Sequence, residues 1–369
     1  MTATLGIDVL VVGLGPAGAR AAAEAAAGGA SVLAIDRKKR PGFPVQCAEF
    51  VPAMIDQELG DLDQVTRQRI DEMITFVEDG VGEVKPDFHG RMVDRGAFDR
   101  LLVDRAAAAG ADIRFDIRPI ELTKDGSVIL ETGETIAPKF IIGADGPRSR
   151  IGKAIGIRNI DVVESRQITV PLLKAHQATD IFVSTKIPGG YGWLFPRGDV
   201  ANIGAGVRAQ DRLRLKEIVE TLHARLVEDG RVGTEISART GGAIPVGGML
   251  HPAGRVGDIP VLLAGDAAGL ANPVTGGGIT SAVISGGLAG SAAAEWIAGD
   301  KDVIDDYVAE LSALFKGSLD HAYHRRQELI EIFEAGGAPT PDQLRQGWIS
   351  YPAYWDERTL KSAEALAAA

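Results

Sequence analysis

The residues with the clearest chemical meaning are three glycines near the start of the chain. An apolar run at residues 8–12 leads directly into Gly13, Gly15 and Gly18, and a second apolar run, after an alanine-rich stretch, ends on Asp36. Gly13 permits a tight turn, Gly15 lets the backbone approach a pyrophosphate, and Gly18 lets a helix lie close to the first strand. This order of strand, turn, helix, strand and acid predicts a dinucleotide-binding unit.

The helix after the glycine turn would supply the binding groups. Its free N–H groups and the positive end of its dipole can hold a pyrophosphate. Asp36 stands at about the spacing at which a carboxylate accepts a hydrogen bond from a ribose hydroxyl. We therefore expect an adenine dinucleotide, and the chain carries one such fingerprint.

Two later segments also end an apolar strand on an acid and a glycine. One strand ends on Asp145 and Gly146, and another ends on Gly265 and Asp266. Ligands of open α/β sheets bind in the crevice outside the carboxyl ends of the strands. We expect both acids at that crevice.

A second group of residues could bind an apolar molecule. Tyr191, Trp193 and Phe195 alternate along an extended segment, so their rings should share one side of a strand. The alternative is an ordinary packed sheet core. Cys47 is the only cysteine, and it is either a reactive thiol or a small buried apolar side chain.

Composition narrows the class of protein. The chain has 369 residues, of which 45% are hydrophobic and 24% are charged, as in ordinary globular proteins. One cysteine excludes an intramolecular disulfide and fits a reducing compartment, and the net charge of −11 argues against a nucleic-acid partner. The first apolar stretch lacks the basic flank of a signal peptide, so we expect a cytoplasmic protein, with peripheral membrane contact left open.

The expected elements divide the chain into three parts. The expected dinucleotide-binding domain is discontinuous and consists of residues 1–72, 94–156 and 248–300. The expected β-rich substrate-binding domain consists of residues 73–93 and 157–247. Residues 301–369 should form a helical cap. The fold class is thus α/β, a Rossmann-like domain with an inserted β-sheet domain and a helical C-terminal segment.

The order of these motifs resembles the two-domain flavoprotein fold of the aromatic hydroxylase type. The resemblance implies that the cofactor is FAD and that Asp266 holds its ribityl and pyrophosphate portion. Asp94 and Arg95, followed by Phe98 and Leu102, are similar to the superfamily helix whose first residues touch FAD. This similarity implies a FAD contact by Arg95.

A closer resemblance is to the geranylgeranyl reductase family. Residues 44–49 are similar to its Pro-x-x-Cys-Gly-Glu segment near the flavin, and residues 191–196 match its Tyr-x-Trp-x-Phe-Pro motif. Residues 272–279 resemble the loop that lies along the isoalloxazine. The chain departs from the family at Ala48, where the motif has glycine, and in a short region after Asp300.

This resemblance, which covers about residues 5–300, implies a reductase of prenyl C=C bonds that transfers a hydride from reduced flavin. Such a reaction needs a proton donor, and the candidate catalytic residues are Cys47 and Tyr191. The implied substrate contacts are Trp193, Phe195 and Pro196. The implied FAD contacts are Gly13, Gly15, Pro16, Ala17, Gly18, Asp36, Arg37, Cys47, Ala48, Arg95, Asp145, Gly146, Gly265, Asp266, Gly277, Gly278 and Ile279.

The resemblance also implies the partners. The substrate would be a hydrophobic isoprenoid or lipid. Because the chain carries one dinucleotide fingerprint, the external electron donor is either NAD(P)H that docks without a fingerprint or another redox protein.

Two other functions remain open. A flavin monooxygenase or halogenase shares the fold, and the halogenase Trp-x-Trp-x-Ile-Pro motif is loosely similar to this chain, with Tyr191 and Phe195 replacing its first tryptophan and its isoleucine. A non-redox FAD-binding protein is the other. We expect no metal site, because His321 and His324, one helical turn apart, have no acid arranged beside them in a metal-binding motif.

Overall fold

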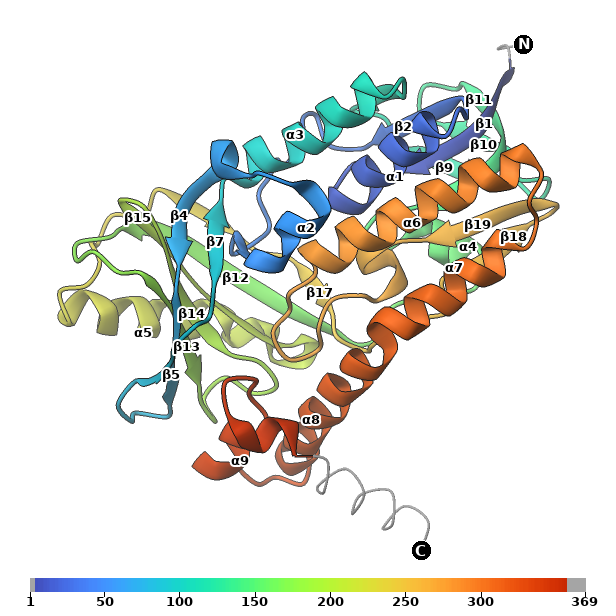
Figure 1. The fold of residues 1–369 in the computed structure, drawn as a ribbon. Coiled ribbons are helices and arrows are strands. Elements are labelled where there is room, and N and C mark those ends of the chain that lie inside the picture. Colours follow the sequence, from blue (N-terminus) through green and yellow to red (C-terminus); the bar gives the residue numbers. More distant parts are fainter. Residues whose placement is uncertain (1–3, 357–369) are drawn as a thin grey trace, which may run out of the picture.

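The computed structural model describes residues 4–356 (Figure 1). Within this range the first of two eight-stranded sheets has the order β18-β19-β11-β1-β2-β8. In addition, β10 pairs with β11, and β9 pairs with β10. Its strands are β1 (Thr4–Val12), β2 (Val32–Asp36), β8 (Asp112–Phe115), β9 (Pro119–Leu122), β10 (Val128–Leu130), β11 (Thr135–Gly143), β18 (Ala253–Val256) and β19 (Ile259–Leu263). The five strands β19, β11, β1, β2 and β8 are mutually parallel.

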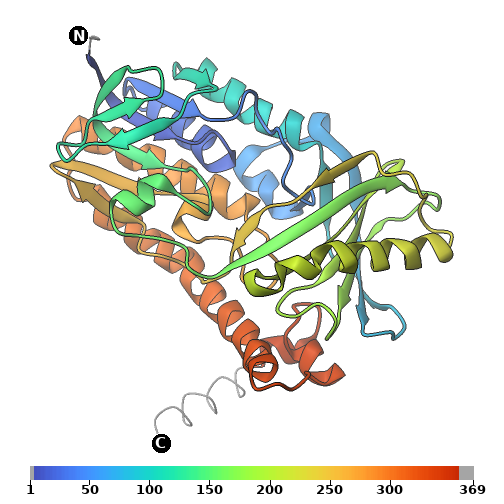
Figure 2. The ribbon, with the colours of Figure 1, turned by 180° about the vertical axis from the view of Figure 1, so that it is seen from behind.

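Helices cover this sheet, as apolar parallel strands require. Along one face lie α1 (Pro16–Ala27), α3 (Arg95–Ala108) and α6 (Ile279–Ala298), whereas the short α4 (Arg150–Ala154) lies on the other (Figures 1 and 2). Small residues bring α1 and α6 together, because a Cβ on Gly286 would lie 2.1 Å from the Ala17 carbonyl oxygen. The expected helix after Asp94 is confirmed, and the Asp94 carboxylate caps it by accepting from the Ala97 N–H.

The second eight-stranded sheet has the order β16-β12-β15-β14-β13-β5-β6, with β17 also paired to β12. Its strands are β5 (Glu72–Val77), β6 (Glu83–Lys85), β12 (Val162–Pro171), β13 (Ala178–Val183), β14 (Gly192–Arg197), β15 (Val200–Arg208), β16 (Ala238–Thr240) and β17 (Ala243–Pro245). Helix α5 (Leu215–Glu228) packs on one face of it (Figure 2). The central strands pair antiparallel, so this sheet presents two distinct faces.

A third, three-stranded sheet was missed by the sequence analysis. It pairs β3 (Phe50–Pro52), β7 (Gly90–Val93) and β4 (Thr66–Ile70). We expected residues 90–93 in the substrate domain, but they pair with strands from the first segment instead. The short strands β3 and β4 are recognisable only through their partner, so local patterning did not reveal them. The domain boundaries themselves stay a prediction.

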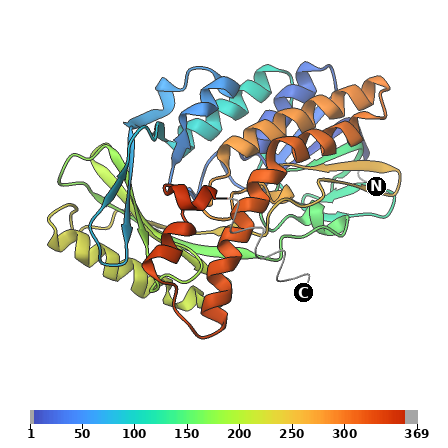
Figure 3. The same ribbon diagram turned by 60° about the horizontal axis from the view of Figure 1, so that its bottom comes forward.

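The described part of the C-terminal region is helical, as expected. Its elements are α7 (Val303–Leu311), a wide turn (Ser312–Lys316), α8 (Gly317–Glu334), α9 (Pro341–Gln346) and a short 3-10 turn (Pro352–Trp355). These helices run from the first sheet to the second, where α9 contacts β5 (Figure 3). Residues 357–369, which we also assigned to the cap, lie outside the described range.

Short helical turns complete the chain. They are α2 (Asp56–Leu59) and the 3-10 turns Ala53–Ile55, Asp63–Val65, Ala209–Arg214 and Gly265–Ala268. Between residues 4 and 356, no helix combines the length and the hydropathy that a membrane crossing requires.

Candidate active site

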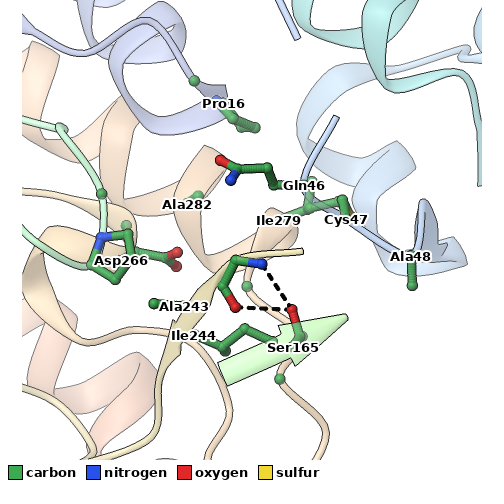
Figure 4. Close-up of a pocket in the computed structure, with 18 of the residues that line it drawn as sticks. Pro16, Gln46, Cys47, Ala48, Ser165, Ala243, Ile244, Asp266, Ile279 and Ala282 are labelled. Carbon is green, nitrogen blue, oxygen red and sulfur yellow. Dashed lines mark hydrogen bonds between the residues drawn. The ribbon is translucent and has the colours of Figure 1, made fainter. Parts of the chain in front are cut away.

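A cavity of about 1110 Å³ lies between the two large sheets. Its walls combine the carboxyl ends of β1, β2, β11 and β19 with the inner face of the second sheet. Figure 4 shows Asp266 and Gln46 pointing into this space, beside Pro16 from the glycine turn. All but two of the residues assigned to FAD or substrate line this cavity, the exceptions being Gly18 and Pro196.

The three glycines of the turn have three different surroundings. Gly13 adopts φ +99°, and a Cβ there would lie 2.3 Å from the Ala144 carbonyl oxygen. A Cβ on Gly18 would lie 1.7 Å from the Gly13 carbonyl oxygen, so Gly18 serves the close approach of α1 to the sheet. A Cβ on Gly15 would meet nothing within 4 Å, which leaves open space at the start of α1 for a pyrophosphate.

Asp36 is buried and fixes the glycine turn to β2. One carboxylate oxygen accepts from the Leu14 N–H at 2.7 Å, and the other accepts from the Lys38 N–H at 2.7 Å. Each oxygen keeps a further lone pair, so the ribose contact stays a prediction. Arg37, which follows, is exposed at the edge of the cavity.

Asp145 uses its carboxylate to organise the next turn of chain. It accepts from the Ser149 hydroxyl at 2.5 Å and from the Arg150 N–H at 2.6 Å. Burial raises the pKa of Asp145, although these hydrogen bonds oppose the rise. A Cβ on the neighbouring Gly146 would meet nothing within 4 Å, so the backbone beside Asp145 is open to a ligand.

Asp266 is the acid whose carboxylate is left free. Its backbone carbonyl accepts from the Asn159 amide at 2.8 Å, but its carboxylate oxygens have no hydrogen-bond donor among residues 4–356. Burial raises the pKa of Asp266 to about 6, against the opposing charge of Arg95. A carboxylate that lines a cavity without a donor suits the ribityl hydroxyls of FAD, and the open turns at Gly15 and Gly146 suit its phosphates. The residues present therefore fit this cofactor.

Arg95 links the cofactor side of the cavity to Cys47. Its guanidinium forms an ion pair with the buried Asp99 at 3.0 Å and also contacts Cys47. Burial alone would lower the pKa of Arg95, but Asp99 and Cys47 raise it above its usual value. A permanent positive charge thus stands beside the only thiol of the chain.

Cys47 is half-buried and held from two sides. Its sulfur accepts from the Glu49 N–H at 3.2 Å. Its carbonyl oxygen accepts from the Gln167 amide at 3.1 Å, and the Gln167 carbonyl oxygen accepts from the Trp193 indole N–H at 3.0 Å. The Cys47 loop is therefore tied to the second sheet through Gln167.

The alternation expected along residues 191–195 is confirmed. Ring centroids lie 5.7 Å apart for Tyr191 and Trp193, and 6.4 Å apart for Trp193 and Phe195. Leu194 points the other way, into the core beneath α5. Pro196 is buried but does not line the cavity, because strand alternation places it on the same side as Leu194. A direct substrate contact by Pro196 is therefore not supported.

Tyr191 has a structural partner that its sequence context did not reveal. Its hydroxyl donates to the Thr275 carbonyl oxygen at 2.6 Å and so ties the glycine-rich loop to the second sheet. Burial raises the pKa of Tyr191, and a thiolate at Cys47 would raise it further. The hydroxyl proton is thus engaged with the loop and firmly held.

Trp348, from the C-terminal helical region, also lines the cavity. Its ring lies 4.7 Å from that of Tyr191, and its buried indole N–H has no partner among the described residues. The buried guanidinium of Arg325 holds the following turn by donating to the Tyr354 carbonyl oxygen at 2.9 Å. Sequence reasoning had no signal for this return of the C-terminal segment, and none for the polar partner Gln167.

The two histidines considered as a metal pair have other surroundings. The His321 Nε2 lies 2.8 Å from the Tyr354 carbonyl oxygen, and its ring stacks on Trp355. The His324 ring contacts Tyr323. Residues 4–356 contain no group of three or more His, Cys, Asp or Glu side chains arranged to hold a metal ion.

Comparison with known protein families supports the assignment of this cavity to FAD. A family model described as a FAD binding domain matches residues 82–322, and one described as a FAD dependent oxidoreductase matches residues 8–146. The chain is therefore a FAD-dependent oxidoreductase.

Individual relatives show to which family of FAD-dependent oxidoreductases the chain belongs. The chain is 35% identical over 306 residues to a digeranylgeranylglycerophospholipid reductase of Methanocaldococcus jannaschii, covering 79% of this chain and 77% of the relative. The crystal structure of a geranylgeranyl bacteriochlorophyll reductase-like protein of Thermoplasma acidophilum matches 98% of this chain and 100% of its own, with 23% identity and a TM-score of 0.82. The chain belongs to the geranylgeranyl reductase family.

The same fold also occurs with other chemistry. A solved flavin-dependent brominase matches 92% of this chain and 98% of its own, with 18% identity and a TM-score of 0.65. Fold alone thus does not separate reductases from halogenases.

Proposed function

We propose that this protein reduces isoprenoid C=C bonds of a lipid, with FAD as its cofactor. The single observation that carries the proposal is one shared cavity. The free Asp266 carboxylate and the open glycine turns line it on one side, and Cys47 and the aromatic face of β14 line it on the other. An apolar chain lying on those rings would therefore meet both the cofactor and a thiol.

Different residues of the cavity would serve different steps of the reaction. FAD, when bound and reduced, would supply hydride chemistry at one carbon of the double bond. The Cys47 thiol would give its proton to the other carbon, and the neighbouring Arg95 would stabilise the thiolate that remains. After the product leaves the cavity, solvent returns a proton to the sulfur. Trp193 and Phe195 hold the prenyl chain, and the apolar wall excludes water.

The substrate class follows from the apolar wall of the cavity and from the names of the similar proteins. Relatives at 32–35% identity are named digeranylgeranylglycerophospholipid reductases. We infer that this chain acts on a geranylgeranyl lipid of that type. The half-buried Phe88 and the exposed Met54 line the cavity at the small third sheet, and we propose that lipid enters there from a membrane surface.

The electron donor and the cellular location belong to the same proposal. One dinucleotide fingerprint serves FAD, so an external donor, either NAD(P)H or a redox protein, would reduce the flavin. A single cysteine is consistent with a cytoplasmic protein that contacts membranes peripherally.

An anaerobic reoxidation experiment tests the reaction. The purified FAD-loaded protein is reduced with dithionite, and geranylgeranyl diphosphate or a digeranylgeranyl glycerophospholipid is added without oxygen. We expect flavin reoxidation together with a product mass gain of about two per bond reduced. No reoxidation until air is admitted, followed by an oxygenated or halogenated product, would instead assign the chain to the monooxygenase or halogenase class.

A Cys47→Ser variant tests the proton donor. The serine keeps the size of the side chain but is a much weaker acid, so FAD should stay bound while substrate-dependent reoxidation slows by about 100-fold, the size typical of general acid catalysis. Unchanged reoxidation would return Cys47 to a packing role.

A further inference from the structure

We propose that Glu49 is the positioning residue that fixes the Cys47 thiol over the cavity. This inference rests on the proposed function, in which Cys47 is the proton donor. Glu49 borders the cavity, but it is not a free proton carrier, because hydrogen bonds from three directions occupy its carboxylate. Its role follows from the elements that supply the donors of those hydrogen bonds.

The Glu49 carboxylate joins the two halves of the molecule. One oxygen accepts from the Arg95 backbone N–H at 3.1 Å, at the start of α3. The other accepts from the Asn202 amide at 3.0 Å, on β15, and Arg197 on β14 forms an ion pair with it at 3.2 Å. Glu49 is only 3% exposed, so these bonds form away from water, where charge-assisted hydrogen bonds are strong.

The Glu49 backbone carries that anchoring to the thiol. Its N–H donates to the Cys47 sulfur at 3.2 Å, and its carbonyl oxygen accepts from the Val93 N–H at 2.8 Å. Glu49 adopts φ +73°, a left-handed conformation that costs energy for a residue with a side chain. A strained backbone persists only when its surroundings over-determine it, and here the carboxylate contacts supply that restraint.

The neighbouring carbonyl groups point to the same arrangement. The Cys47 carbonyl oxygen accepts from Gln167, and the Ala48 carbonyl oxygen accepts from Asn202 at 3.4 Å. Asn202 is itself oriented by the Thr169 hydroxyl, which donates to its amide oxygen at 2.8 Å. Each residue of the Cys47–Glu49 turn is thus bound to the second sheet, and Glu49 adds the only charged link among them.

The test is a Glu49→Gln variant. Glutamine has nearly the same shape, but its NH₂ group would face donors from Arg197 and Asn202 or from Arg95. We expect FAD to stay bound and KM for the lipid to change little, while kcat falls by about 100-fold, the cost of misplacing a catalytic group by about 1 Å. Alkylation of Cys47, which is the only thiol, by iodoacetamide should become about tenfold faster, because a loosened turn exposes its sulfur more often.

A double-mutant cycle separates positioning from general destabilisation. If Glu49 acts through Cys47, the Glu49→Gln change should leave kcat nearly unaffected in a Cys47→Ser background. Equal loss of kcat in both backgrounds would overturn the proposal. So would an alkylation rate in Glu49→Gln that equals or falls below the original rate.

Two further variants serve as controls. Glu78 also has a positive φ, +53°, and its carboxylate accepts from the Ser184 hydroxyl and the Thr185 N–H, away from the cavity. Glu78→Gln should therefore alter neither kcat nor alkylation. Glu49→Gly relieves the backbone strain but removes the anchor, so it should lose kcat as Glu49→Gln does; full activity in the glycine variant would show that turn geometry alone positions Cys47.

The alkylation assay keeps the two proposals apart. If the original protein fails to reduce a lipid, the proposed function fails, yet faster alkylation in Glu49→Gln would still establish that Glu49 holds the turn. If the original protein reduces the lipid and Glu49→Gln matches it in kcat and alkylation, the role of Glu49 alone is disproved.

Discussion

The two large sheets build the cavity in different ways. The parallel sheet contributes the ends of its strands, where backbone groups of Gly13, Gly15 and Gly146 line the space. The antiparallel sheet contributes a face, on which Trp193 and Phe195 lie side by side. One half therefore binds through main-chain geometry and the other through side-chain surface.

This difference determines which substitutions each half of the cavity tolerates. At the strand ends a single added Cβ either collides with backbone or blocks a ligand, so position decides the effect. On the sheet face, successive residues of a strand point to opposite sides. A substitution therefore affects either stability, where the side chain faces the core, or substrate binding, where it faces the cavity.

The glycine turn should give the largest effect. In Gly18→Ala the new Cβ would lie 1.7 Å from the Gly13 carbonyl oxygen, so α1 must move and the free energy of unfolding should fall by about 4 kcal/mol or more. In Gly15→Ala the new Cβ meets open space, so the stability of the FAD-free protein should hardly change while FAD affinity drops. Denaturant unfolding and FAD titration measure the two; equal stability of both variants would contradict the packing role of Gly18.

Substitutions on the face of the second sheet should have the next largest effect, on stability or on KM. Leu194 is fully buried beneath α5, so Leu194→Ala should lower the free energy of unfolding by about 2–5 kcal/mol, with kinetics per folded molecule unchanged. Phe195→Leu keeps an apolar wall but removes a ring from the cavity, so it should raise KM for the lipid several-fold at a stability cost of about 1 kcal/mol. A raised KM in Leu194→Ala would show that the two faces are not independent.

Asp266 should make FAD affinity depend on pH. Burial raises its pKa to about 6, so in the FAD-free protein it takes up a proton as the pH falls through that value. Ribityl hydroxyls would donate to the ionised form, so affinity should fall by up to about tenfold per pH unit below 6. Titration calorimetry between pH 5 and 8 measures this, and Asp266→Asn should bind FAD weakly with little pH dependence. A wild-type affinity that is flat across this range would show that Asp266 does not bind FAD as a carboxylate.

The same ionisation should have the opposite effect on the stability of the FAD-free protein. The folded-state pKa of Asp266 lies above its ordinary value of 3.8, so the folded state binds the proton more tightly than the unfolded state. The cost of burying the charge is therefore full above about pH 6 and disappears as the pH falls toward 4. The difference in unfolding free energy between the original protein and Asp266→Asn should shrink over that range.

Trp348 should give the smallest effect. Its indole N–H is buried without a partner, so Trp348→Phe removes an unsatisfied donor while it leaves a small void. These two terms oppose each other, and the free energy of unfolding should change by no more than about 1 kcal/mol. A loss of several kcal/mol in thermal or denaturant unfolding would mean that the N–H has a partner in solution.

Much of the nucleotide half could be predicted from sequence because its signals are local. The glycine turn, its flanking strands and the acid at Asp36 lie within a short stretch, and backbone sterics fix their meaning. The alternation of the rings in β14 is equally local, because a strand turns successive side chains to opposite sides. The small third sheet escaped prediction, since β3 and β4 depend on β7 for their pairing.

By itself the sequence determined the strand ends, the shared side of the rings and the family to which the motifs point. The tertiary structure alone decided which carboxylates are free and which are engaged. Asp36 and Asp145 are bound by backbone N–H groups, whereas Asp266 is left open to the cavity. It also decided which groups bind the Glu49 carboxylate, among them Asn202, which is 153 residues away along the chain. A hydrogen bond depends on which donor folding brings within about 3 Å, and no local pattern encodes a donor so distant in sequence.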